Sequence, residues 1–218
     1  MANEKLFKTL NRKWLIGYLT VNIVLFGILI GFISPSYESI EEIFTKLHSP
    51  SGILPILLFP LTIVFEGIFP SNLKYIIIFL KLNNPLPASK AFSYFAKRDP
   101  RIDESELDWL FPDGRPDDPK EQNRQWYKLF RKYESKPIVQ DSHRNFLLTR
   151  DLLSLTLLII PTSLVVHLFW DSPFKVIITH CLSLLIIAFI IRFSAKHYGE
   201  RFVENVLVEA TIGGNNGS

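Results

Sequence analysis

The chain has 218 residues, of which 48% are hydrophobic and 21% are charged, and its formal net charge is +3. The charged fraction is too high for a protein made only of membrane spans, so we expect a polar domain beside the apolar segments. A single cysteine excludes an intrachain disulfide framework. The sequence has no Gly-rich phosphate loop, Cys/His set or Ser/His/Asp arrangement, so we predict no catalytic residue, no metal and no cofactor.

The first apolar segment, residues 14–33, follows a basic N-terminus at residues 1–13. It is too long for the core of a signal peptide and ends without a small-x-small cleavage site, which predicts an uncleaved first span. Gly27 and Gly31 stand four residues apart within it. Such a step lets two helix backbones approach closely, and we predict a packing contact there; the alternative is that glycine is simply common in membrane helices.

The second apolar segment follows an acidic outer loop at residues 34–51 and is interrupted by prolines. Glu66 lies in its apolar middle. Because a carboxylate in hydrocarbon is costly, we predict that Glu66 faces the bundle interior as a gating or ion-conducting residue, with a protonated helix contact as the alternative. Residues 71–82 are too few to cross a bilayer alone. They either continue the second span across a kink at Pro70 or form an interfacial helix.

The polar region is residues 83–146, and it carries clear helix signals. Asp103 and Asp118 have the sequence context of helix N-caps, the second with proline at the first helical position. After Asp118, four apolar residues recur at helical spacing and predict one buried face: Trp126, Leu129, Phe130 and Tyr133. A basic face lies largely on the other side and consists of Lys120, Arg124, Lys128, Arg131 and Lys132. We predict that this face lies on anionic lipid, where each basic residue contributes about 1 kcal/mol, or binds a phosphate-rich ligand such as a nucleotide or RNA.

Residues 147–193 have the pattern of two apolar helices joined by a short turn at residues 171–173. Each helix is long enough to cross a hydrocarbon core of about 30 Å, and the short turn makes the two spans antiparallel. The turn also brings His167 and His180 to similar depths near the outer interface. We predict that these histidines are neighbours, either as a proton-sensing pair or as two satisfied polar residues.

Charged residues mark the cytoplasmic ends of these two spans: Arg144, Arg150, Asp151 and Arg192. We predict that they lie at the membrane interface, where they would couple the spans to the polar region. We expect Arg150 to anchor to lipid phosphate and Asp151 to be favoured by the dipole of a helix start. A helix beginning at Pro137 is predicted to run uninterrupted into the third span. The helix of the fourth span is predicted to continue into residues 194–218, which end in a frayed tail.

Arg192 and His197 have the Arg-x4-His spacing associated with HEPN-type ribonucleases. With ten arginines and five histidines, a chain of this length contains such a pair at some position about as often as not. A membrane-bound nuclease is therefore only one of the alternatives.

Lys and Arg gather in the N-terminus, the polar region and the C-terminal segment, whereas the outer loop has one and the turn at 171–173 has none. This bias places both termini and the polar region in the cytoplasm of a bacterial inner membrane. We therefore predict an all-α integral membrane protein with four transmembrane helices and a small helical cytoplasmic domain between spans two and three. Helices one and two lie within residues 14–82, and helices three and four within 147–193.

The leading functional hypothesis is a non-enzymatic, homo-oligomeric membrane effector. Its cytoplasmic domain would sense a protein partner or a phosphate-rich small ligand and alter the membrane bundle or its permeability, as in stress response or antiphage defence. The alternatives are a membrane anchor or sensor subunit that recruits a soluble partner protein, and a membrane-bound HEPN-like ribonuclease. We expect the lipid bilayer as a partner and no DNA.

Overall fold

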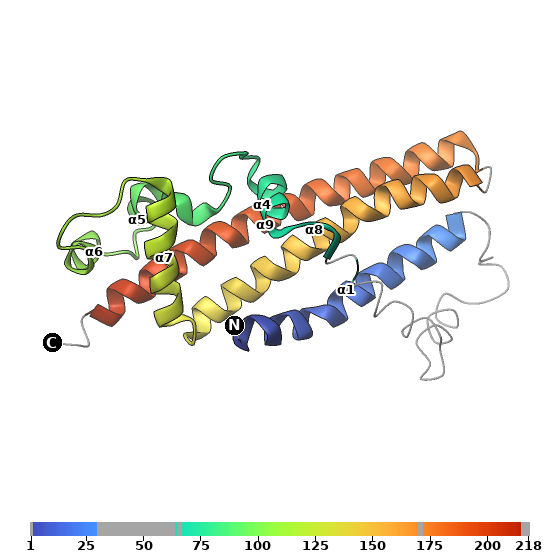
Figure 1. Cartoon of the computed structure of the whole chain (residues 1–218). Helices are drawn as coiled ribbons and strands as arrows, with labels where there is room; N and C mark the ends of the chain where they lie inside the picture. The colour runs from blue at the N-terminus through green and yellow to red at the C-terminus, as the bar shows by residue number, and fades with distance from the viewer. Residues whose placement is uncertain (1, 30–63, 65–66, 170–171, 215–218) are drawn as a thin grey trace. The chain divides into compact units, whose positions relative to one another are not determined.

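A computed structural model of the chain describes residues 2–29, 64, 67–169 and 172–214 (Figure 1). Every element assigned in these residues is a helix, which confirms the all-α class. Three helices are long and apolar enough to span a membrane, over Phe7–Leu29, Pro137–Leu168 and Phe174–Ile212. The first, third and fourth predicted spans are therefore membrane helices by length and composition.

The helices in chain order are α1 (Ala2–Leu29), α4 (Ser71–Phe79), α5 (Ala96–Arg98), α6 (Glu104–Leu110), α7 (Pro119–Tyr133), α8 (Pro137–Phe169) and α9 (Phe174–Gly214). A 3-10 helix at Pro87–Lys90 and a π-helix at Ala91–Phe95 lead directly into α5. Residues 87–98 are thus one helical stretch that changes its winding twice, where the sequence predicts a single short helix. Helices α8 and α9 are unbroken, as predicted.

The chain divides into two compact units. The bundle unit comprises residues 1–70 and 150–191, and the polar unit comprises residues 71–149 and 192–218. Helices α8 and α9 contribute residues to both. The polar unit is larger than the predicted domain at 83–146, because it also contains α4 and the C-terminal part of α9.

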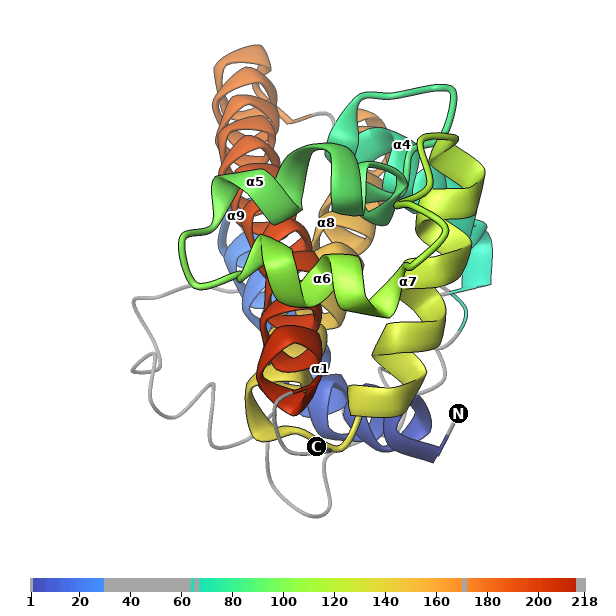
Figure 2. The ribbon, with the colours of Figure 1, turned by 90° about the vertical axis from the view of Figure 1, so that its left-hand side faces the viewer.

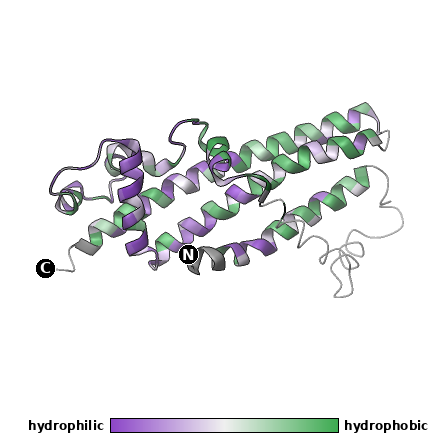
Figure 3. Cartoon of the chain, viewed as in Figure 1, coloured by the Kyte–Doolittle hydropathy of each residue, from purple (hydrophilic) through white to green (hydrophobic). Residues whose placement is uncertain are grey.

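In the bundle unit, α1 packs against α8 through polar as well as apolar contacts. The Tyr18 hydroxyl lies 2.8 Å from Oγ1 of Thr156. Leu15, Leu19 and Val24 are buried on the same helix. Many apolar side chains of this unit are exposed, among them Val21, Ile23, Leu25, Val165, Leu168, Leu182, Ile186, Phe189 and Ile190. Figure 3 shows how strongly apolar residues dominate these stretches of α8 and α9.

In the polar unit, α7 packs on the C-terminal part of α9, which Figure 2 shows beside it. The ring of Trp126 stacks on Phe130 and meets Phe202 edge-on, at centroid distances of 5.7 and 5.2 Å. The indole nitrogen of Trp126 donates a hydrogen bond to the Val203 carbonyl at 3.2 Å. The predicted apolar face of α7 is confirmed as a core contact, and Trp126 is buried rather than free to stack on a base.

Both predicted N-caps are present. The Asp103 carboxylate accepts a hydrogen bond from the Ser105 amide at the start of α6. The Asp118 carboxylate accepts hydrogen bonds from the amides of Lys120 and Glu121 at the start of α7. These carboxylates satisfy donors that have no partner within the helix, so each fixes where its helix begins.

Helix α4 starts anew at Ser71, after a bend at Phe69 and a non-helical Pro70. It ends at Phe79, because the next residue, Leu80, has a φ of 51° that does not continue a right-handed helix. Its Phe79 lies 6.3 Å from Phe146 of α8, between ring centroids. Residues 71–79 are thus a helix of their own in the described part of the chain, and both alternatives for residues 71–82 stay predictions.

Candidate ligand pocket and polar clusters

The polar unit contains a pocket with four asparagines among its ten lining residues, here called the asparagine pocket. It has a volume of 610 Å³, within the usual range of small-ligand sites. Three separate segments form it: the start of α4, the strap of residues 80–90 and the first turn of α7. Its lining residues are Asn72, Leu82, Asn83, Asn84, Pro85, Leu86, Ser89, Pro119, Lys120 and Asn123.

The local fold explains why these groups converge. The strap reverses direction at Asn84, which has a φ of 49°, a conformation that asparagine tolerates better than most residues. The Asn84 carbonyl accepts a hydrogen bond from the Ser89 hydroxyl at 3.2 Å, and this contact closes the strap. The π-helix after it is held to α7 by the buried Gln122, whose Oε1 accepts hydrogen bonds from the amides of Phe92 and Ser93.

The pocket combines four primary amides with one ammonium group, that of Lys120. Each amide can donate and accept hydrogen bonds, and the lysine adds a positive charge. This combination suits a ligand rich in hydrogen-bonding groups and negatively charged, such as a sugar phosphate or a nucleotide. Of the predicted basic face, only Lys120 lines the pocket.

The other members of the basic face are exposed along α7: Arg124, Lys128, Arg131 and Lys132. Two of them pair with acidic residues of the same region, Arg124 with Glu121 at 2.9 Å and Arg131 with Glu134 at 2.8 Å. The asparagines were missed by the sequence analysis. The pair at 83–84 before Pro85 is the signal that marks a turn there, but nothing local connects it to Asn72 or Asn123.

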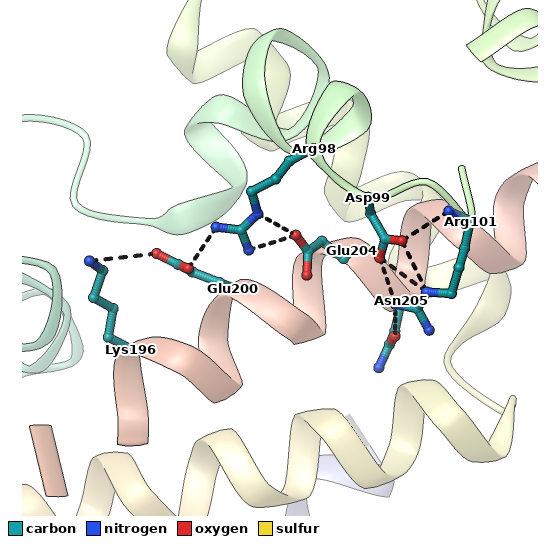
Figure 4. A network of polar contacts seen from close by, with 7 residues as sticks. All are labelled: Arg98, Asp99, Arg101, Lys196, Glu200, Glu204 and Asn205. Carbon is teal, nitrogen blue, oxygen red and sulfur yellow. Dashed lines mark hydrogen bonds and ion pairs between the residues drawn. The ribbon is translucent and has the colours of Figure 1, made fainter. Parts of the chain in front are cut away.

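An ion-pair network joins the segment after the π-helix to α9 (Figure 4). Arg98 contacts Glu200 at 2.9 Å and Glu204 at 2.6 Å. Burial of the Arg98 guanidinium lowers its pKa, but hydrogen bonds to Glu200 and Glu204 outweigh this effect, so the pKa is raised. These ion pairs fix α5 on the polar part of α9.

A second pair lies beside it (Figure 4). Arg101 donates to Asp99 at 2.6 Å and to the Asn205 side chain at 3.1 Å. The hydrogen bond from Arg101 lowers the pKa of the Asp99 carboxyl. Together the two clusters attach residues 98–101 to two successive turns of α9.

The bundle unit places His167 and His180 together, as predicted. Nε2 of His167 lies 3.0 Å from Nδ1 of His180, and its Nδ1 lies 3.0 Å from the Ser172 hydroxyl. Both rings pack against Phe26, at centroid distances of 4.7 and 5.5 Å. His167 is fully buried, so the turn between α8 and α9 is closed by a hydrogen-bonded polar pair. A proton-sensing role of the pair stays a prediction.

Arg150 was expected to anchor to lipid phosphate, and Asp151 to lie at a helix start. The structure shows neither arrangement. Both side chains are buried, and the Arg150 Nε donates to Asp151 at 3.0 Å. Asp151 also lies deep inside α8, which begins at Pro137, so the dipole of a helix start does not act on it. Burial explains the pairing, because a charge removed from water needs an opposite charge beside it.

The remaining predicted residues lie apart from the pocket. Arg192 donates from Nε to the Ile77 carbonyl at 3.1 Å and so attaches α4 to α9. Arg144 is half-buried on α8, and Gly27 is buried on α1. Glu66 and Gly31 lie outside the described residues, so the predictions on them stand as predictions.

Arg192 and His197 are both on α9, five residues apart. At 3.6 residues per turn their side chains leave the helix about 140° apart. His197 is exposed, whereas Arg192 donates a hydrogen bond to the Ile77 carbonyl. The helix therefore does not bring this pair together as one site.

No family model, curated protein or solved structure matches this chain.

Proposed function

We propose that this chain is a homo-oligomeric effector with four spans in a bacterial inner membrane. Its polar unit lies in the cytoplasm, where it binds a phosphate-rich ligand or a protein partner and alters the membrane bundle. The proposal makes it a non-enzymatic protein of stress response or antiphage defence. It rests chiefly on one observation, the continuity of α8 and α9 through both units.

Continuous helices are suited to coupling. Helix α8 has 33 residues and α9 has 41, so they are about 50 and 60 Å long, well beyond a hydrocarbon core of about 30 Å. A helix without a break transmits a displacement along its axis, because it bends sharply only at features such as Pro161. A ligand that repacks the polar unit around α9 would therefore act on the same helix within the bundle.

The input site in this proposal is the asparagine pocket with Lys120. The polar unit is held to α9 by charged contacts through Arg98 and Arg101, and such networks can be rearranged by a bound anion. The output site is Glu66, the carboxylate in the predicted second span. The exposed apolar surface of the bundle unit supports membrane embedding and leaves room for contacts between copies.

Cysteine labelling tests the topology. In a Cys181→Ser background, a cysteine at Ser39 is expected to react with an impermeant maleimide from outside intact cells, and one at Lys128 only after lysis. Lys128 is chosen because it is exposed on α7, whereas its neighbour Gln122 is buried. Labelling of Lys128→Cys in intact cells contradicts the cytoplasmic placement of the polar unit.

Dye release from proteoliposomes tests the effector function. With carboxyfluorescein inside and ATP or inorganic pyrophosphate added to the face that carries the polar unit, we expect release from the wild type. Lys120→Ala should abolish the response to the added anion, and Glu66→Gln should reduce release without changing the particle mass. Lys128→Ala, which removes a lysine from the same helix outside the pocket, is the matched control. Equal behaviour of all four proteins contradicts the proposal.

The alternative of an anchor that recruits a soluble protein is favoured by one side chain. Trp109 on α6 is 84% exposed, and a tryptophan in water is the residue type most enriched at binding hot spots. In that case a soluble protein copurifies with the wild type and is lost with Trp109→Ala, while Glu66 is replaceable. A particle that is a closed oligomer of this chain alone favours the effector instead.

A further inference from the structure

The bundle unit contains a cavity of 180 Å³ between α1, α8 and α9, which shares no lining residue with the asparagine pocket. An apolar cavity of about 150 Å³ is large enough to bind benzene, so this one has room for a single six-membered ring. His180 is the residue that α9 contributes to it. Its apolar lining comes from α1 and α8 and consists of Leu19, Ile23, Phe26, Ile159 and Val166.

The polar side chains that α1 and α8 contribute to this cavity already bond within their own helices. Asn22 donates to the Tyr18 carbonyl at 2.8 Å. The hydroxyl protons of Thr162 and Ser163 are donated to carbonyls of α8, at 2.8 and 2.9 Å. Such bonds are usual for polar residues of an apolar helix and do not by themselves indicate a ligand.

His180 differs from these residues. Its side chain is only 8% exposed, and its Nδ1 lies 3.0 Å from Nε2 of His167. Its own Nε2 forms no hydrogen bond within the described part of the chain. A ring nitrogen so far removed from water needs a hydrogen-bond partner. Because the ring lines the cavity, a ligand bound there is the partner that Nε2 can reach.

The hydrogen bonds behind His180 allow Nε2 to donate or to accept. The Ser172 hydroxyl lies 3.0 Å from Nδ1 of His167, which in turn contacts His180. If Ser172 donates to His167, then His167 donates to Nδ1 of His180, and Nε2 of His180 carries the proton. If His167 donates to Ser172, the protons of the chain are reversed and Nε2 accepts. Both arrangements keep the two rings neutral.

We propose that this cavity binds a neutral aromatic ring that bears a hydroxyl group, the chemistry of phenols and quinols, with the hydroxyl bonded to Nε2 of His180. A hydroxyl can donate and accept, so it matches either proton arrangement of the histidine chain. The Phe26 ring stacks on that of His180 at a centroid distance of 5.5 Å, and aromatic side chains of this kind favour a flat ring beside them.

Other ligand classes fit the cavity less well. A hydrocarbon of the same size would fill the space but leave Nε2 without a partner. A phosphate or carboxylate would enter an apolar site whose lining contains no lysine or arginine, and burying an unpaired charge is costly. The site is therefore distinct in chemistry from the asparagine pocket, and it does not depend on the proposed effector function.

Fluorine NMR of the full chain in detergent tests the site by titration with para-fluorophenol and, separately, fluorobenzene, each compared with empty micelles. We expect saturable binding of both, with para-fluorophenol about fivefold tighter, which corresponds to one hydrogen bond. His180→Asn keeps a polar group near the position of Nδ1, for the contact with His167, and removes Nε2. This variant should bind the two probes equally.

A second variant tests the cavity without changing the histidines. Ile159→Phe enlarges a lining side chain and should abolish saturable binding of both probes. The matched control Ile186→Phe makes the same change at a 61% exposed position of α9 outside the cavity and should bind as the wild type does. Thermal unfolding of each variant verifies that it is folded.

Three results overturn the proposal. The first is the absence of saturable binding to the wild type, and the second is binding that survives Ile159→Phe, which places the site elsewhere. The third is an unchanged preference for para-fluorophenol in folded His180→Asn, which excludes Nε2 as the partner. In the wild type, nitrogen NMR of labelled histidine should also show a shift of the His180 Nε2 signal with para-fluorophenol and none with fluorobenzene.

Discussion

The bundle unit exposes large apolar side chains that the polar unit buries, and α9 shows both patterns along its length. In the bundle part of α9, Ile186, Phe189 and Ile190 are 61%, 65% and 58% exposed. In its polar part, Val206 and Leu207 are completely buried. Helical propensity does not distinguish the two halves, so the difference lies in what surrounds them. The exposed apolar side chains of the first half suit a hydrocarbon environment, and the buried apolar side chains of the second half suit water.

Hydrogen bonding differs in the same way. Hydroxyl groups of the bundle unit bond to the carbonyl four residues earlier in their own helix, as Thr156 does to Leu152 at 2.8 Å and Ser183 to Thr179 at 2.8 Å. The polar unit instead uses charged pairs between distant segments, such as Arg98 with Glu204. A medium without water makes every unpaired donor costly, and in the bundle unit such hydroxyl groups are satisfied within their own helix or, as with Tyr18 and Thr156, between helices.

The largest expected loss of stability comes from truncating a side chain in the apolar core of the polar unit. Trp126→Ala removes a buried ring that contacts Phe130 and Phe202, and such a change typically costs about 3–5 kcal/mol. We expect a lower midpoint of thermal unfolding in detergent, together with rapid proteolysis in residues 83–136.

The control for this change is the other tryptophan of the unit. Trp109→Ala removes an exposed ring and should change stability by no more than about 0.5 kcal/mol. If the two variants unfold at the same temperature, the polar unit does not have the core described for it.

Part of this contrast could be predicted from the sequence, because it depends on neighbours along the chain. Asp118 followed by proline is a local signal, and the short distance along the chain between two apolar segments predicts that His167 and His180 are neighbours. Contacts across the fold leave no such signal. Gln122 is buried, and it accepts hydrogen bonds from the amides of Phe92 and Ser93 in the π-helix, about thirty residues away in the chain.

Arg150 and Asp151 are a second case of a contact that the sequence does not predict. Adjacent residues on a helix point about 100° apart, so their sequence does not predict a pair. The long arginine reaches the carboxylate only because both side chains are enclosed by the bundle unit. The asparagine pocket likewise needs three distant segments to meet, which no local pattern records.

The next largest loss of stability is expected from breaking the buried pair of Arg150 and Asp151, which belongs to the bundle unit. Arg150→Ala leaves the Asp151 carboxylate without its guanidinium in a buried site, and we expect a loss of about 3 kcal/mol. The double variant Arg150→Leu/Asp151→Leu should be less destabilised than either single alanine variant, because it removes both members of this buried pair together. Thermal unfolding in detergent measures all of them. A double variant less stable than both single variants would show that the pair holds the helices in place by contacts that leucine cannot replace.

The smallest effect compares glycines from the two units. A Cβ at Gly199 would lie 2.8 Å from the rings of both Phe146 and Phe79, so Gly199→Ala should cost about 1–3 kcal/mol through overpacking. A Cβ at Gly17 of α1 meets nothing within 4 Å, and the higher helix propensity of alanine there should leave stability unchanged or raise it by about 0.5–1 kcal/mol.

The two glycine variants are best measured in detergent and again in nanodiscs, where copies of the chain can associate. Lipid adapts to an added methyl group, whereas a packed helix does not, so Gly17→Ala should remain neutral if α1 faces lipid. A loss at Gly17 that occurs only in the oligomer means that a second copy packs against this part of α1. Gly199→Ala has no such dependence, because the aromatic rings that close on it belong to the same polar unit, and its cost should be equal in both media.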